Sequence, residues 1–118
     1  MKLIMVLVLL VMPTGSYGMD SNNQYVTRGI GGHSCGEYNQ TRQNPSSRLS
    51  FWNWMSGYVT AYNRWTPDTY DIMSNRGLDS LRGWLDNYCK ENPLESFEDA
   101  VGALISELHP KRLKEKGQ

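Results

Sequence analysis

The chain has 118 residues, with 12 Lys and Arg against 12 Asp and Glu. This length fits one small domain. The near-neutral charge gives no reason to expect a nucleic acid or an anionic membrane as partner, because both are bound by clusters of basic residues. No glycine-rich phosphate loop, paired-histidine metal motif or nucleophile elbow occurs. We therefore predict a non-enzyme with no catalytic, cofactor-binding or metal-ligating residues.

Residues 1–18 have the pattern of a secretory signal peptide. Lys2 supplies the positive start, ten apolar residues follow over 3–12, and Ser16 and Gly18 are the small residues of a cleavage site. The alternative is a membrane anchor, but a membrane-spanning helix needs about 20 apolar residues. Cleavage after Gly18 would remove Lys2 and leave 11 basic against 12 acidic residues, a balance of −1. The pattern predicts an exported protein without a stable membrane anchor.

The two cysteines, Cys35 and Cys89, both lie in the exported part of the chain. In an oxidising compartment an even count of cysteines predicts a disulfide. Closing a loop of this length would stabilise the fold by at most about 4 kcal/mol. The alternative is a catalytic thiol activated by His33. Two residues of separation do not place an imidazole against a thiol, so the disulfide is favoured.

Capping residues predict three of the helices. Ser34 and Glu37 form the pattern of a capping box and begin a short first helix, which ends before Pro45. Asp79 caps a third helix over residues 80–91. Ser96 and Asp99 form a second capping box, with Asp in place of the usual Glu, and begin the last helix.

The central helix is predicted over residues 49–65, LSFWNWMSGYVTAYNRW, with a cap at Ser46 or Ser47. Apolar side chains at helical spacing cover more than one of its faces, which is typical of a helix surrounded by other elements. Gly57 and its small neighbours would let another helix approach closely. We expect Gly83 of the third helix to pack there.

Three segments have no helical period. Residues 19–32 are polar and rich in glycine, and are predicted to be a mobile leader. Residues 66–78 contain turn formers, and Tyr70 with Ile72 or Met73 is expected to point inward. The carboxylates of this segment lack the spacing of a calcium loop, so we interpret them as solvated turn residues. Residues 111–118 are predicted to be a solvated basic tail.

No alternating strand pattern occurs, so the predicted fold is all-α. It is a small four-helix domain over residues 33–110, with one disulfide joining the first and third helices. The predicted core comprises Leu49, Trp52, Met55, Val59, Tyr62, Leu81, Leu85, Val101, Leu104, Ile105 and Leu108.

The order of the short motifs resembles a known family. After the signal peptide come Ser34-Cys35-Gly36-Glu37-Tyr38, Gly57-Tyr58 with Asn63, Trp84-Leu85, Tyr88-Cys89 and Asn92-Pro93-Leu94. This is similar to the small periplasmic helical proteins of the HdeA/HdeB type, and to the related Rap/Tai immunity proteins that guard the periplasm against type VI secretion amidases. The resemblance covers residues 33–109. It implies a bacterial periplasmic protein, often dimeric and not enzymatic.

Three functions are therefore considered: a holdase for unfolding client proteins at acid pH, an immunity-type protein that binds one toxin enzyme through residues 66–78, and an enzyme, which is the least favoured.

A small domain cannot bury 4 Trp, 7 Tyr and 2 Phe in one core. Some aromatic residues should form an exposed partner surface, closed by self-association as a homodimer when no partner is bound. The candidates are Tyr58, Arg64, Trp65, Tyr70, Arg82 and Trp84.

Overall fold

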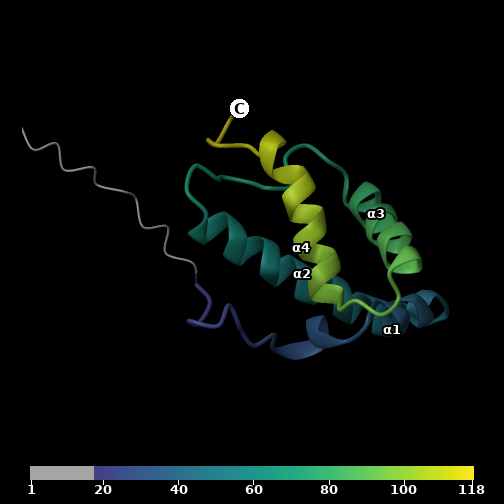
Figure 1. Cartoon of the computed structure of the whole chain (residues 1–118). Helices are drawn as coiled ribbons and strands as arrows, with labels where there is room; N and C mark the ends of the chain where they lie inside the picture. The colour runs from purple at the N-terminus through teal and green to yellow at the C-terminus, as the bar shows by residue number, and fades with distance from the viewer. Residues whose placement is uncertain (1–17) are drawn as a thin grey trace, which may run out of the picture.

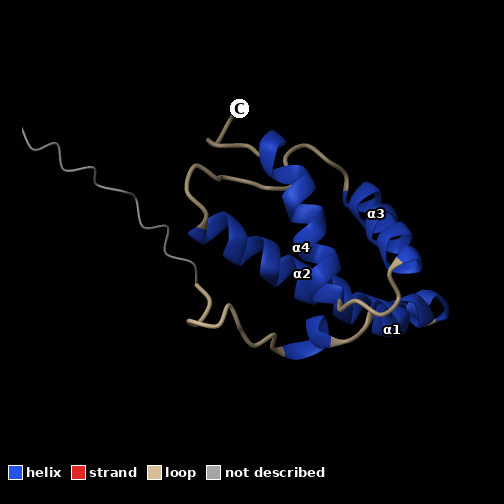
Figure 2. Cartoon of the chain, in the orientation of Figure 1, coloured by secondary structure: helices blue, strands red, loops and turns tan. Residues whose placement is uncertain are grey.

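The computed structural model describes residues 18–118, and this part of the chain contains four α-helices and no strands (Figures 1 and 2). The helices are α1 (Cys35–Gln40), α2 (Pro45–Trp65), α3 (Leu78–Glu91) and α4 (Phe97–Leu108). The prediction of an all-α fold is confirmed. The predicted signal peptide lies outside the described residues, apart from Gly18.

The core is built around α4. This helix contacts α1, α2 and α3, and Figure 1 shows it crossing α2 and running beside α3. A continuous apolar stripe explains its position, because residues spaced three or four apart share one face of a helix. The buried apolar residues of α4 are Phe97, Ala100, Val101, Leu104, Ile105 and Leu108. Tyr38 of α1 and Phe51 of α2 close the core with ring centroids 4.8 and 4.9 Å from that of Phe97.

The N-termini of α1 and α4 are joined to each other. Ser34 and Ser96 each cap their helix in a capping box, as the sequence predicts for both. The two caps lie side by side, since Cys35 N donates to Glu95 O at 2.7 Å and Phe97 N donates to His33 O at 2.8 Å. Hydrogen bonds from the backbone N–H and hydroxyl of Ser34 hold the pKa of Glu37 below its usual value.

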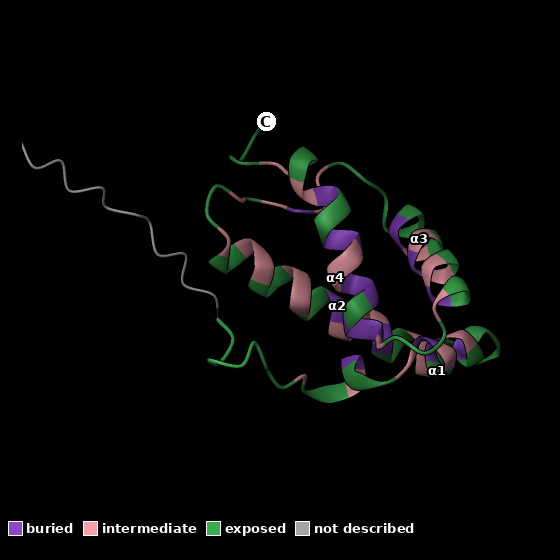
Figure 3. Cartoon of the chain, viewed as in Figure 1, coloured by how far each residue is buried: buried purple, intermediate pink, exposed green. Residues whose placement is uncertain are grey.

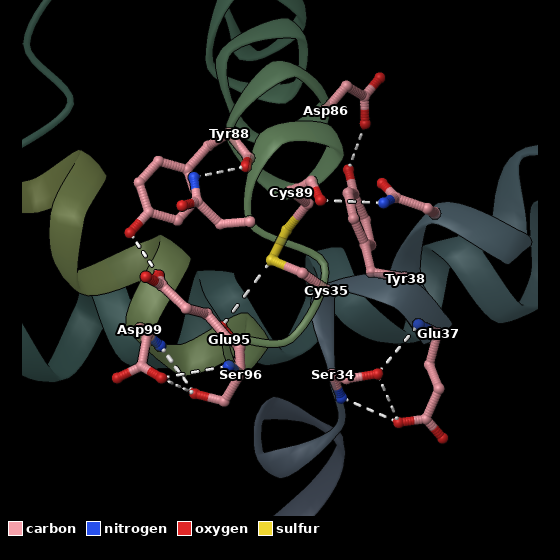
Figure 4. Close-up of a disulfide and its surroundings, with 12 residues drawn as sticks. Ser34, Cys35, Glu37, Tyr38, Asp86, Tyr88, Cys89, Glu95, Ser96 and Asp99 are labelled. Carbon is pink, nitrogen blue, oxygen red and sulfur yellow. Dashed lines mark hydrogen bonds between the residues drawn. A yellow bond between two sulfur atoms is a disulfide. The ribbon is translucent and has the colours of Figure 1, made fainter.

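The disulfide between Cys35 and Cys89 joins α1 to α3, as predicted (Figure 4). Both cysteines are completely buried. The side-chain amide of Asn39, one turn along α1, donates to Cys89 O at 2.9 Å, so a polar contact supports the covalent link.

The central helix differs most from expectation. Phe51 and Met55 are the residues of α2 that are buried, while Trp52, Val59 and Tyr62 are only partly buried. The predicted core position of Leu49 is wrong, because its side chain is 50% exposed. The helix lies at the edge of the domain with one face in solvent, and the prediction that other elements surround it is also wrong (Figure 3).

The remaining predicted core positions are buried, on α2, α3 and α4: Met55, Leu81, Leu85, Val101, Leu104, Ile105 and Leu108. Two helix starts differ from the sequence assignment. Asn44 caps α2 by accepting from Ser47 N at 3.2 Å, with Pro45 at the first helical position. Gly77 precedes α3 without a side-chain cap, and Asp79 lies in the first turn of that helix.

The predicted close packing of Gly83 against Gly57 does not occur. Both glycines face open space, with no heavy atom within 4 Å of an added Cβ. Side chains connect α2 and α3 instead: Arg48 pairs with Asp86, and the Arg82 guanidinium lies 3.7 Å from the centroid of the Trp52 ring. These long polar side chains keep the two backbones too far apart for glycine contacts.

The predicted mobile leader is partly docked. Gly29–Gly32 forms a 3-10 helix that contacts α2 and α4. Trp54 Nε1 donates to Arg28 O at 2.8 Å, and a Cβ on the buried Gly31 would lie 2.1 Å from the Trp54 ring. The expectation of a detached leader is therefore wrong for this end of it, because a large aromatic side chain of α2 packs directly on a glycine backbone.

Candidate protein-binding surface

Trp65, the last residue of α2, is the most exposed tryptophan and has 76% of its surface in solvent. The guanidinium of Arg64 lies 5.4 Å from the centroid of the Trp65 ring, in the range of a cation–π contact. Tyr70, five residues further along, is also exposed. We call Arg64, Trp65 and Tyr70 the Trp65 surface. Figure 3 shows the end of α2 and the turn after it as exposed.

The segment that follows Trp65 is held to α2 by hydrogen bonds with the side chain of Asn63. Asn63 Oδ1 accepts from Ile72 N at 2.8 Å, and Asn63 Nδ2 donates to Asp71 Oδ1 at 3.4 Å. Ile72 is buried, whereas Tyr70 is not, so the expectation that Tyr70 points inward is wrong. Asp68 and Ser74 have positive φ angles, which are incompatible with a right-handed helix at either residue, and no helix lies between Trp65 and Leu78. One asparagine of α2 thus holds the turn against the domain.

The chain after α4 holds the same turn from its other side. Leu113 N donates to Asp71 O at 2.9 Å, and Leu113 O accepts from Tyr70 N at 2.8 Å. The Arg112 guanidinium donates to Asp68 O and to Thr69 Oγ1, both at 3.0 Å. The prediction of a solvated tail is therefore wrong for Arg112 and Leu113. Because both sides of the turn are hydrogen-bonded, Tyr70 is presented on a fixed backbone.

The other predicted partner residues lie elsewhere. Tyr58 is half-buried and donates to Glu98 Oε1 at 3.2 Å. Arg82 covers Trp52 rather than pairing with Trp84. Trp84 stacks on Tyr88 with ring centroids 5.1 Å apart and donates to Glu107 Oε2 at 2.8 Å. The six candidates therefore do not form one patch, and only the Trp65 surface combines high exposure with a neighbouring cation.

A polar cluster between α1, α2 and α3 was not singled out from the sequence. The Tyr38 hydroxyl donates to Asp86 Oδ1 at 2.7 Å and accepts from Arg48 at 3.2 Å and from Trp52 Nε1 at 3.3 Å (Figure 4 shows the Tyr38–Asp86 contact). Arg48 also pairs with Asp86. Burial and the hydrogen bond to Asp86 raise the pKa of Tyr38 to about 12. Because these contacts join side chains of three helices, the cluster fixes the helices relative to one another.

The histidines and cysteines have defined partners. His33 Nδ1 lies 3.1 Å from Glu37 Oε1, and His109 Nδ1 lies 2.6 Å from the hydroxyl of Tyr62. Both cysteines are in the disulfide, which removes the alternative of a thiol activated by His33. Within residues 18–118, no three His, Cys, Asp or Glu side chains are grouped closely enough to hold a metal ion. In the same part of the chain, no helix has the length and apolarity needed to cross a bilayer.

Fold and surface together define a small helical domain stapled by one disulfide, with an exposed tryptophan at a helix end. Comparisons with protein families, with curated proteins and with solved structures found no match to this chain.

Proposed function

We propose that this chain is an exported, non-enzymatic domain that binds one protein partner through the Trp65 surface, in the manner of the periplasmic immunity proteins that its sequence resembles. The observation that carries the proposal is the exposure of Trp65 on a fixed support. Tryptophan, tyrosine and arginine dominate the binding energy of protein interfaces, and the Trp65 surface contains one of each.

The fixed turn favours a single partner over many clients. Asn63, Arg112 and Leu113 hold the backbone around Tyr70, so little conformational entropy is lost when a partner binds. A surface that adapts to many unfolded clients needs flexible side chains or loops instead. Preorganisation therefore supports recognition of one folded protein at neutral pH.

The test is capture of proteins from the extract of the exported compartment at neutral pH, followed by titration calorimetry with the protein that is captured. Trp65→Ala should weaken binding by about 2 kcal/mol or more, the scale of an interface hot spot. Leu94→Ala is the matched control, because Leu94 is 97% exposed in the turn between α3 and α4. Equal losses in both variants, or no captured protein that binds the purified domain, would contradict the proposal.

The holdase alternative rests on a different observation, namely carboxylates that hold the fold in their charged form. The pKa of Glu37 is lowered by its contacts with Ser34, so its contribution to stability is present above its unfolded pKa and is lost as pH falls through the folded value. Asp86 pairs with Arg48 and so joins α3 to α2. Suppression of client aggregation at acid pH, unaffected by Trp65→Ala, would favour the holdase over the specific binder.

Self-association stays a prediction. A second copy is the expected occupant of the Trp65 surface when no partner is present. Sedimentation at micromolar concentration should then detect a dimer that Trp65→Ala dissociates and Leu94→Ala does not.

A further inference from the structure

Glu98, in the first turn of α4, is a carboxylate placed where a protein interior disfavours charge. Only 7% of its surface is exposed. The ion pairs of residues 18–118 are His33–Glu37, Arg48–Asp86 and Arg82–Asp79, so Glu98 has no cationic partner in this part of the chain. A buried charge without a countercharge is unfavourable unless other groups compensate it.

Two phenols compensate part of the charge on Glu98. The hydroxyl of Tyr25, in the leader, donates to Oε2 at 2.9 Å, and the hydroxyl of Tyr58, in α2, donates to Oε1 at 3.2 Å. The hydrogen bond from Tyr25 raises the pKa of that phenol, and burial raises the pKa of Tyr58 to about 12. Both tyrosines are therefore neutral donors at physiological pH, and neither supplies a positive charge beside Glu98.

Two adjoining hollows open onto this carboxylate. One, of about 180 Å³, is lined by Tyr25, Tyr58 and Trp54 together with Glu98, and its wall includes Arg28. The other, of about 380 Å³, has the same two tyrosines and Glu98, and is completed by Gly18 and Met19. Although Arg28 lines the smaller hollow, it forms no ion pair with Glu98 in residues 18–118, and its backbone carbonyl accepts from Trp54 Nε1.

Aromatic walls around a carboxylate favour one class of ligand. The face of an aromatic ring attracts a cation, and an ammonium group carrying apolar substituents also gains from contact with apolar walls. The Trp54 and Tyr58 ring centroids are 5.4 Å apart, and both rings line the smaller hollow. A bare metal ion would need more oxygen ligands than Glu98 alone supplies.

We propose that Glu98, Tyr25, Tyr58 and Trp54 form a binding site for an organic ammonium group. The site is separate from the Trp65 surface and does not depend on the function proposed for that surface. The ammonium has two sources: a separate amine, or the α-amino group of Met19, which cleavage after Gly18 would leave in the wall of the larger hollow.

The experiment uses residues 19–118 in two forms, one with an acetylated Met19 amino group and one with a free amino group. Each is titrated with tetramethylammonium chloride, and with sodium chloride as the ionic control. The readout is the NMR signal of the Trp54 indole N–H, assigned by its loss in Trp54→Phe. We expect a saturable shift of this signal in the acetylated chain with tetramethylammonium only.

Glu98→Gln removes the charge but keeps the shape of the side chain. Its one amide oxygen can accept from only one of the two tyrosines, and its NH2 group faces the hydroxyl of the other. This change should weaken binding by about tenfold or more. Glu107→Gln is the matched control, since Glu107 accepts from the indole of Trp84 at a different place on α4. Binding to Glu107→Gln should be unchanged. Tyr58→Leu removes one aromatic wall and gives a second test should Glu98→Gln fail to fold.

The two forms of the chain identify the source of the ammonium. If the free-amino form binds the probe about tenfold more weakly and its α-amino pKa lies above the ordinary value of about 8, the Met19 amino group occupies the site. Equal affinities assign the site to a separate amine. An acetylated chain without a saturable shift, or binding retained in both Glu98→Gln and Tyr58→Leu, would overturn the proposal.

Discussion

The hydroxyl of Tyr38 donates to Asp86 Oδ1 at 2.7 Å, and so joins α1 to α3 beside the disulfide that already links the two helices. The same oxygen accepts from Arg48 and from Trp52 Nε1, both in α2. One side-chain atom therefore connects three helices. The covalent link restrains the distance between α1 and α3, and the hydroxyl fixes how α2 lies against them.

Tyr38→Phe should destabilise the fold by about 1 to 3 kcal/mol, because it leaves a part-buried carboxylate and an indole N–H without one of their partners. The measurement is the midpoint of urea unfolding. Tyr70→Phe removes a hydroxyl from an exposed tyrosine and serves as the control, with no expected change. A similar midpoint for both variants would show that the three-helix contact contributes little.

Stability should fall steeply at alkaline pH. The pKa values of Tyr38 and Tyr58 are raised from 10.0 to about 12, so the folded state favours their neutral forms. This contribution is complete below pH 10 and is lost as pH rises through about 12. Unfolding midpoints measured at a series of pH values should fall in this window, in parallel with the rise in phenolate absorbance. Tyr38→Phe should make the alkaline loss smaller, and an unchanged loss would argue against this origin.

Phe51 and Leu49 offer a comparison on one helix. Phe51→Ala should cost about 3 to 5 kcal/mol because its buried ring packs on Tyr38 and Phe97. Leu49→Ala should change stability by no more than about 0.5 kcal/mol, since half of that side chain is in solvent. Thermal unfolding measures both. A large cost for Leu49→Ala would place that face of α2 in an interface in solution.

Gly31→Ala should displace the leader from α2. The added Cβ would lie 2.1 Å from the Trp54 ring. Because the ring is rigid, either the whole ring or the backbone of the leader must move. The expected cost is about 1 to 3 kcal/mol. Faster proteolysis within residues 19–32 and a changed Trp54 environment in the fluorescence spectrum would report the displacement. Gly32→Ala is the neighbouring control, because its added Cβ meets no heavy atom within 4 Å.

Local signals were sufficient to predict the starts of α1 and α4. The capping boxes at Ser34 and Ser96 depend on residues three positions apart, so they are readable from sequence alone. The apolar stripe of α4 was equally clear, because its period leaves one face to bury. The disulfide followed from the even cysteine count and did not require knowledge of the fold.

The orientation of α2 could not be predicted in the same way. Aromatic residues lie on several of its faces, and periodicity does not identify which face meets α4. The structure buries Phe51 and Met55 and leaves Leu49 exposed. That choice depends on contacts with residues distant in sequence, including the leader that covers Trp54.

Glu98 illustrates a second limit of the sequence. A glutamate in the first turn of a helix is usually explained by the helix dipole, and the sequence pattern around Glu98 indicates nothing more. Its burial depends on Tyr25, 73 positions earlier in the chain, and on Tyr58. Asn63, Arg112 and Leu113 are similar cases, because they hold the turn after α2 from separate parts of the chain.

The disulfide encloses α1, α2 and α3 in one covalent loop, whereas α4 lies beyond its second cysteine. Both cysteines therefore precede, along the chain, the helix that contributes more buried residues than any other helix. The disulfide can therefore form in a chain that still lacks α4 and the apolar side chains that α4 contributes to the core. Loss of about the last twenty residues would leave the disulfide loop without the core residues of α4. An intact disulfide is therefore no proof that the molecule is folded.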